Sequence, residues 1–146
     1  MSDTSLLRHF VAALAYRSRR VLDGAPSGFS DIEIGHGIRR PVEILSHMSN
    51  VLSFAIRTIS NSDEPKAARE AGAWDAEMQR YFSVLHDFDA ILDGVAAIDR
   101  ELAERLLQGP LADAMTHVGQ LAMLRRAAGA PIPPENFFAA DISDRI

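Results

Sequence analysis

The sequence contains no cysteine, which excludes disulfides, thiolate zinc sites, iron–sulfur clusters and a cysteine nucleophile. It also lacks a Gly-x-Ser-x-Gly elbow, a phosphate-cradling loop and a dinucleotide fingerprint, so no hydroxyl nucleophile or nucleotide site is predicted. Positive charge is scarce, because 15 Lys and Arg residues face 20 Asp and Glu residues, giving a net charge of −5. This acidic balance argues against binding to nucleic acid.

Long hydrophobic runs are absent as well. The run from Phe10 to Tyr16 is far shorter than the ~20 apolar residues of a bilayer-spanning helix. The residues around it include neither a basic region nor a cleavage site of small residues. We therefore expect a cytoplasmic protein with no membrane partner. A chain of 146 residues suits one domain, and we expect a single helical domain over residues 1–146.

Helix-forming residues dominate the sequence, and the spacing of apolar residues predicts four main helices. The first should span about residues 4–22, the second residues 41–59 and the third residues 74–92. A short helix over residues 98–107 should stop at Gly109-Pro110. The last helix should then begin at Pro110, whose missing N–H costs nothing in a first turn, and run to Ala128.

Two stretches should lie outside these helices. Residues 24–40 are polar and glycine-rich, and connections of this length are often functional. The tail from Gly129 holds three prolines and should be extended, packing back along the bundle so that Phe137, Phe138 and Ile142 are buried. The sequence therefore predicts an all-α four-helix bundle with a long connection after the first helix and an extended C-terminal tail.

The simplest reactive centre for such a chain is a metal held by side chains on facing helices. Asp113 and His117 are four residues apart, so they share one face of the last helix. His117 projects between Leu121 and Leu124, inside the apolar arc. A carboxylate near a core is costly unless it is paired or bound to a metal, and a divalent ion would satisfy both groups. The alternative is a structural Asp113–His117 ion pair.

A third candidate ligand is His47 on the second helix. It lies on the flank of the apolar stripe, on the same side as Val51 and Phe54. A flank position suits a ligand that reaches a neighbouring helix, although it equally suits a half-exposed histidine. Glu43, one turn earlier, is a candidate fourth ligand or outer partner of the metal. A glutamate there also favours the N-terminus of a helix.

The remaining charged candidates have simpler interpretations. His36 lies in the loop before the second helix, where it either lines a cavity or is solvated, and His9 and His86 are expected at the surface. Arg125 and Arg126 end the last helix, where cations complement the helix dipole. The alternative for this arginine pair is an anion-binding rim around a substrate.

Two runs of sequence resemble the DinB-like family of small metal-binding helical proteins, the DinB/YfiT superfamily. They are RRPVEILSHM (39–48) and LLQGPLADAMTHVGQLAMLRRAAGAPIPPENF (106–137). The stretch WDAEMQRYFSVLHDFDAIL is similar to the third helix of that family. The specific part is a ligand pair at i,i+4 followed by Gly-Gln-Leu, an arginine pair and Gly-x-Pro.

The resemblance implies one ligand histidine on the second helix and an H-x-x-x-H pair on the last. His47 matches the first of these and His117 the final histidine, whereas Asp113 stands where the family usually has histidine. A carboxylate still binds metal, but it favours a harder ion or binds more weakly than imidazole. We therefore expect zinc, nickel or manganese at His47, Asp113 and His117, with a vestigial site as the alternative.

The resemblance also implies a function. Family members include metal-dependent transferases and isomerases, which suggests a thiol S-transferase or isomerase in which the metal holds a low-molecular-weight thiol that attacks an electrophilic substrate. It further implies a homodimer. The alternative is a non-catalytic metal-binding or dimeric interaction protein with no enzymatic activity. No residue identifies the thiol, the electrophile or the physiological process.

Overall fold

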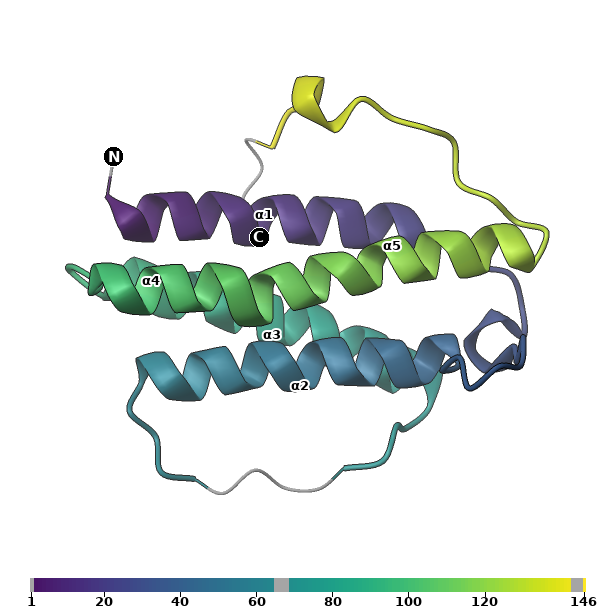
Figure 1. The fold of residues 1–146 in the computed structure, drawn as a ribbon, viewed down its shortest axis with the longest axis horizontal. Coiled ribbons are helices and arrows are strands. Elements are labelled where there is room, and N and C mark those ends of the chain that lie inside the picture. The colour runs from purple at the N-terminus through teal and green to yellow at the C-terminus, as the bar shows by residue number, and fades with distance from the viewer. Residues whose placement is uncertain (1, 65–68, 143–145) are drawn as a thin grey trace.

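The computed structural model describes residues 2–64, 69–142 and 146, which form a bundle of helices (Figure 1). The long helices are α1 (Asp3–Leu22), α2 (Pro41–Ile59) and α3 (Trp74–Gly94). Helix α4 (Arg100–Leu106) continues through a π-helical turn (Leu107–Leu111) into α5 (Ala112–Ala127), so the three pieces form one rod. The described ranges contain no strand, which confirms the all-α class. None of their helices has the length and apolar character that a membrane crossing needs.

The four rods pack in a ring. Helices α1 and α2 each contact both α3 and α5, so α1 and α2 lie diagonally opposite each other. Helices α2 and α3 run in the same direction, opposite to α1 and α5 (Figure 1). Each rod contributes fully buried side chains to one core, among them Leu14, Met48, Leu85 and Leu121. The packing sets α2 beside α5, the two helices that carry the candidate ligands.

The predicted break at Gly109-Pro110 is wrong. Pro110 lacks a backbone N–H, and in a regular helix its ring would clash with the carbonyl four residues earlier. The π-helical turn relieves this conflict by widening the helix, and the N–H of Ala112 bonds to the carbonyl oxygen of Leu107 five residues earlier. The helical rod therefore passes through the proline and enters α5 just before Asp113.

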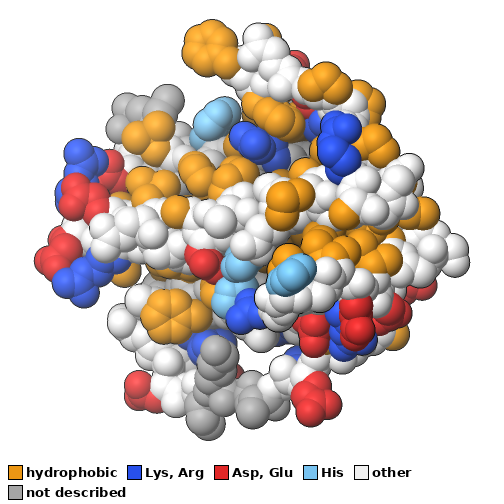
Figure 2. Space-filling model, turned by 45° about the vertical axis from the view of Figure 1, so that its right-hand side comes forward, with side chains coloured by type: hydrophobic (Ala, Val, Ile, Leu, Met, Phe, Trp, Pro, Cys, Tyr) orange, Lys and Arg blue, Asp and Glu red, His pale blue; other side chains and the backbone are white. Residues whose placement is uncertain are grey.

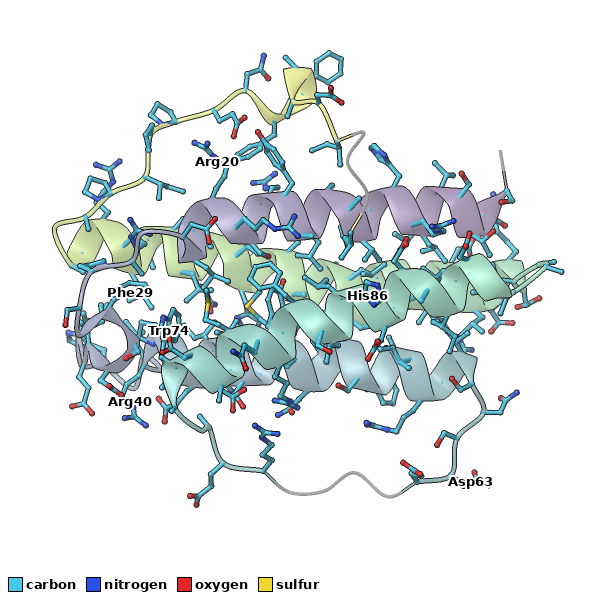
Figure 3. All side chains as sticks on the ribbon, turned by 180° about the vertical axis from the view of Figure 1, so that it is seen from behind. Arg20, Phe29, Arg40, Asp63, Trp74 and His86 are labelled. Carbon is cyan, nitrogen blue, oxygen red and sulfur yellow. The ribbon has the colours of Figure 1, made fainter. Side chains whose placement is uncertain are left out.

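The connection after α1 is held by buried side chains. Phe29, in a short 3₁₀ turn, is 1% exposed and packs edge to face on Trp74 at the start of α3, as Figure 3 shows. Arg125 of α5 is also buried and donates hydrogen bonds to four carbonyl oxygens. The acceptors are Val21, Asp23, Gly24 and Ala130, at 2.9–3.3 Å. Arg125 thus caps the C-terminus of α1 and is unavailable to a substrate anion.

The C-terminal tail crosses the outer side of α1 (Figure 1). The Phe137 ring packs edge to face on Tyr16, and the Arg17 guanidinium lies 4.0 Å from the centre of the same ring. Arg20, labelled in Figure 3, points toward the tail and donates to the carbonyl oxygen of Pro133. The tail therefore packs back on the bundle as expected, except that Phe138 is 99% exposed.

Candidate metal centre

The structure brings the three predicted ligand side chains together between α2 and α5. Asp113 Oδ2 lies 3.0 Å from His47 Nε2 and 3.5 Å from His117 Nε2. The two imidazole rings meet edge to face, with their centroids 4.7 Å apart. One ligand atom from each residue lies within 4.8 Å of the other two. The i,i+4 spacing on α5 and the neighbouring position of α2 account for this convergence.

These distances suit a bound ion. Zinc–ligand bonds of ~2.0–2.2 Å at tetrahedral angles place two ligand atoms about 3.4 Å apart. The two separations from Asp113 Oδ2, 3.0 and 3.5 Å, lie close to that value. Imidazole nitrogen and carboxylate oxygen together suit zinc, nickel or manganese. His47, Asp113 and His117 could therefore hold a metal ion.

The same contacts also describe a metal-free hydrogen-bond network. His47 Nε2 and Asp113 Oδ2 are at hydrogen-bond distance, so an imidazole N–H can donate to the carboxylate. The sequence left a structural Asp113–His117 pair as the alternative, and in this network His47 is the nearer partner of Asp113.

Gln120 orients one of the imidazole rings. Its side-chain oxygen lies 2.6 Å from His117 Nδ1, and because a carbonyl oxygen only accepts, this hydrogen bond forms in the tautomer that carries its proton on Nδ1. The lone pair of His117 is then on Nε2, the nitrogen nearest to Asp113 Oδ2. Partners of this kind fix the tautomer and direction of metal-binding histidines. The role of Gln120 was not predicted from the sequence, although its i,i+3 spacing from His117 was a signal.

Two clefts open onto these side chains. The first, about 480 Å³, lies toward the loop before α2, and the second, about 610 Å³, lies toward the π-helical turn. Both are lined by His47 and Asp113, whose side chains are 32% and 43% exposed. Figure 2 shows histidine side chains gathered on one face with an acidic side chain beside them. An ion held here would be accessible from both clefts.

The loop before α2 forms one edge of the first cleft. Gly35, His36 and Gly37 all have positive φ angles, a left-handed conformation that glycine adopts without strain. The turn brings Gly37, Ile38 and Arg39 to the lining of the first cleft. His36 is exposed and lines neither cleft, which matches the solvated alternative.

Three other candidates lie apart from the centre. Glu43 Oε2 accepts a 2.8 Å hydrogen bond from the Arg40 backbone N–H at the start of α2. That hydrogen bond lowers the pKa of the Glu43 carboxyl. Glu43 therefore serves the N-terminus of α2, and the suggestion of a fourth ligand is wrong. His9 and His86 are exposed, and His86, labelled in Figure 3, belongs to α3.

Comparison of the chain with protein-family models, curated proteins and solved structures finds no match. The resemblance to the DinB-like family thus rests on the sequence motifs alone, and the candidate metal centre rests on the geometry of its three side chains.

Proposed function

We propose that the protein binds a divalent transition metal through His47, Asp113 and His117 and that it is a metal-dependent enzyme. The observation that carries the proposal is the convergence of three ligand side chains from two helices at a point open to two clefts. Three protein ligands with room for a further one are typical of catalytic centres, whereas structural zinc sites are closed by four.

The side chains around the centre suit such a role. A bound divalent ion lowers the pKa of a water or thiol attached to it, which supplies a nucleophile at neutral pH. Gln120 holds the His117 ring in one tautomer. Ile38 and Met123 add exposed apolar surface to the lining of the first cleft.

The finer proposal is a thiol S-transferase or isomerase of the DinB-like type. Its support is the pair of sequence runs that resemble that family, together with the two clefts that meet at His47 and Asp113. Two clefts offer separate places for a small thiol and an electrophilic substrate. The metal is zinc, nickel or manganese, because all three accept imidazole and carboxylate.

The homodimer implied by the resemblance stays a prediction. Phe54 and Met123, which line the second and first clefts, are 54% and 60% exposed. Exposed apolar side chains beside a cleft are typical of contact surfaces, and a second copy of the chain is the partner we propose.

Metal binding is tested by His47→Ala. We expect the affinity for Zn²⁺ to fall by more than about 100-fold, since losing even an outer partner of a ligand costs about 10- to 100-fold. Calorimetric titration at neutral pH measures the loss. The matched control is His86→Ala on α3, whose parent side chain is 66% exposed. Equal Zn²⁺ affinity in wild type and His47→Ala would contradict the proposed site.

Asp113→His separates a metal centre from a structural ion pair. At a metal centre, imidazole is the better ligand for Zn²⁺ or Ni²⁺, so the variant should bind these ions more tightly than wild type. In a structural ion pair, the variant would set a third imidazole against two others and lower stability with no gain in metal affinity. Zn²⁺ titration and thermal unfolding with a chelator present measure both properties.

A further inference from the structure

The first cleft contains one cationic side chain, Arg39. Within the described part of the chain Arg39 makes no hydrogen bond or ion pair, whereas the neighbouring Arg40 pairs with Asp31 and Glu43. Arg39 is exposed and acts on Glu43 only through its charge. Among the described residues, the lining of the second cleft includes no Lys or Arg. The first cleft therefore holds a guanidinium whose donors are free for a ligand.

The charge of the first cleft depends on the metal. Without an ion, the positive charge of Arg39 and the negative charge of Asp113 balance each other. A divalent ion at His47, Asp113 and His117 leaves the cleft with two excess positive charges. A cleft lined by one sign of charge concentrates ligands of the opposite sign. The metal-loaded cleft should thus attract an anion, and the metal-free cleft should not.

The volume and the lining of the first cleft indicate which kind of anion it could bind. A volume of about 480 Å³ lies in the range of small-molecule sites. Ile38 and Met123, which line the cleft and are 42% and 60% exposed, offer apolar surface for a short hydrocarbon chain. A guanidinium pairs with a carboxylate through two parallel hydrogen bonds, which fixes orientation as well as adding affinity. These features together suit a short organic acid.

We propose that the first cleft binds a small organic carboxylate whose anionic group pairs with Arg39 while its other end faces the metal centre. This inference rests on the proposed function, because the bound ion supplies the excess of positive charge. It assigns Arg39 a role in selecting the substrate and distinguishes the first cleft from the second.

Succinate and its uncharged counterpart succinamide are the probes. Calorimetric titration of the Zn²⁺-loaded protein should show binding of succinate and at least ~10-fold weaker binding of succinamide, as expected when a charge-assisted hydrogen bond is lost. Arg39→Gln should weaken succinate binding by a similar factor while keeping its Zn²⁺ affinity. The control is Arg57→Gln on α2, which removes the same charge ten residues, or ~15 Å of helix, beyond His47. Metal-free wild type should not bind succinate.

The outcomes separate the two proposals. If wild type binds Zn²⁺ but Arg39→Gln binds succinate as tightly as wild type, the carboxylate site is wrong and the metal centre stands. Equal binding of succinate and succinamide by wild type would also show that the carboxylate site is wrong while leaving the metal centre in place. If wild type binds no Zn²⁺, the metal centre is wrong and the carboxylate site falls with it.

Discussion

Replacing Arg125 with alanine is expected to lower the free energy of unfolding by about 1–3 kcal/mol, the cost of leaving a buried hydrogen-bonding group without its partner. The guanidinium is 6% exposed and serves four backbone carbonyl oxygens. Its removal leaves the buried carbonyl oxygen of Val21 without this donor, whereas the carbonyl oxygens of the exposed residues Asp23 and Gly24 can bond to water instead. Urea unfolding of wild type and variant measures the difference.

Arg126→Ala is the matched control, because Arg126 is the next residue of α5 and is exposed. Its effect should stay within about 0.5 kcal/mol, as for ordinary surface positions. Arg125→Lys should recover only part of the loss, since an ammonium group cannot reproduce the spread of guanidinium donors. Equal stability of Arg125→Ala and Arg126→Ala would refute the capping role.

The hydrogen-bond partners of Arg125 could not be predicted from the sequence. Its position in the last turn of α5 predicted an interaction with the dipole of its own helix. The structure instead directs it to carbonyl groups at the end of α1 and in the following connection. Those acceptors are about a hundred residues away in sequence, and backbone carbonyls carry no sequence signature. Packing of α5 against α1 decides the partner.

Helix boundaries with a local cause were predicted well. Pro41 begins α2 and Trp74 begins α3, as expected, because proline suits a first turn and the apolar spacing starts there. Gly109-Pro110 was misjudged because the two residues usually end helices. A π-helical turn accommodates Pro110 without ending the helix. The packing of α4 and α5 against the rest of the bundle stabilises this turn, and a local sequence pattern does not reveal that packing.

The candidate ligands could be named from sequence because spacing on one helix is a local property. The i,i+4 pair of Asp113 and His117 follows from helix geometry alone. Helix geometry does not predict the distance from His47 to Asp113 or the positions of the two clefts, because these depend on how α2 packs on α5. Arg39 was overlooked for the same reason: nothing in its sequence context places it at the edge of a cleft.

A buried carboxylate on α3 supplies the second large effect. The Glu77 side chain is 0% exposed, yet it has donors on several sides. Its carboxylate accepts hydrogen bonds from the Gly72 backbone N–H at 2.9 Å, from Arg69 at 3.2 Å and from Arg80 at 3.3 Å. Arg80 also donates to Asn50 of α2. Glu77 thus links the segment before α3 to α3 itself and, through Arg80, to α2.

These donors keep Glu77 ionised. Burial alone would raise the pKa of the Glu77 carboxyl, but the hydrogen bonds from Gly72 and Arg80 and the charges of Arg69 and Arg80 lower it overall. A carboxyl whose pKa is lower in the folded than in the unfolded chain stabilises the fold above the unfolded pKa, about 4.3 for glutamate. That stability is lost as the pH falls through the lowered folded pKa.

We expect Glu77→Gln to lower the free energy of unfolding by about 1.5–3 kcal/mol at neutral pH, the range for hydrogen bonds to a charged group, because the Gly72 N–H and the partly exposed Arg69 and Arg80 lose the buried anion. Below about pH 4 the deficit should shrink, since wild type then loses the same charge while the variant has none to lose. Urea unfolding at neutral and acidic pH measures both, with exposed Glu70→Gln as the control. A deficit that is the same at every pH would mean that shape and hydrogen bonding, and not the charge of Glu77, hold the segment before α3 to the bundle.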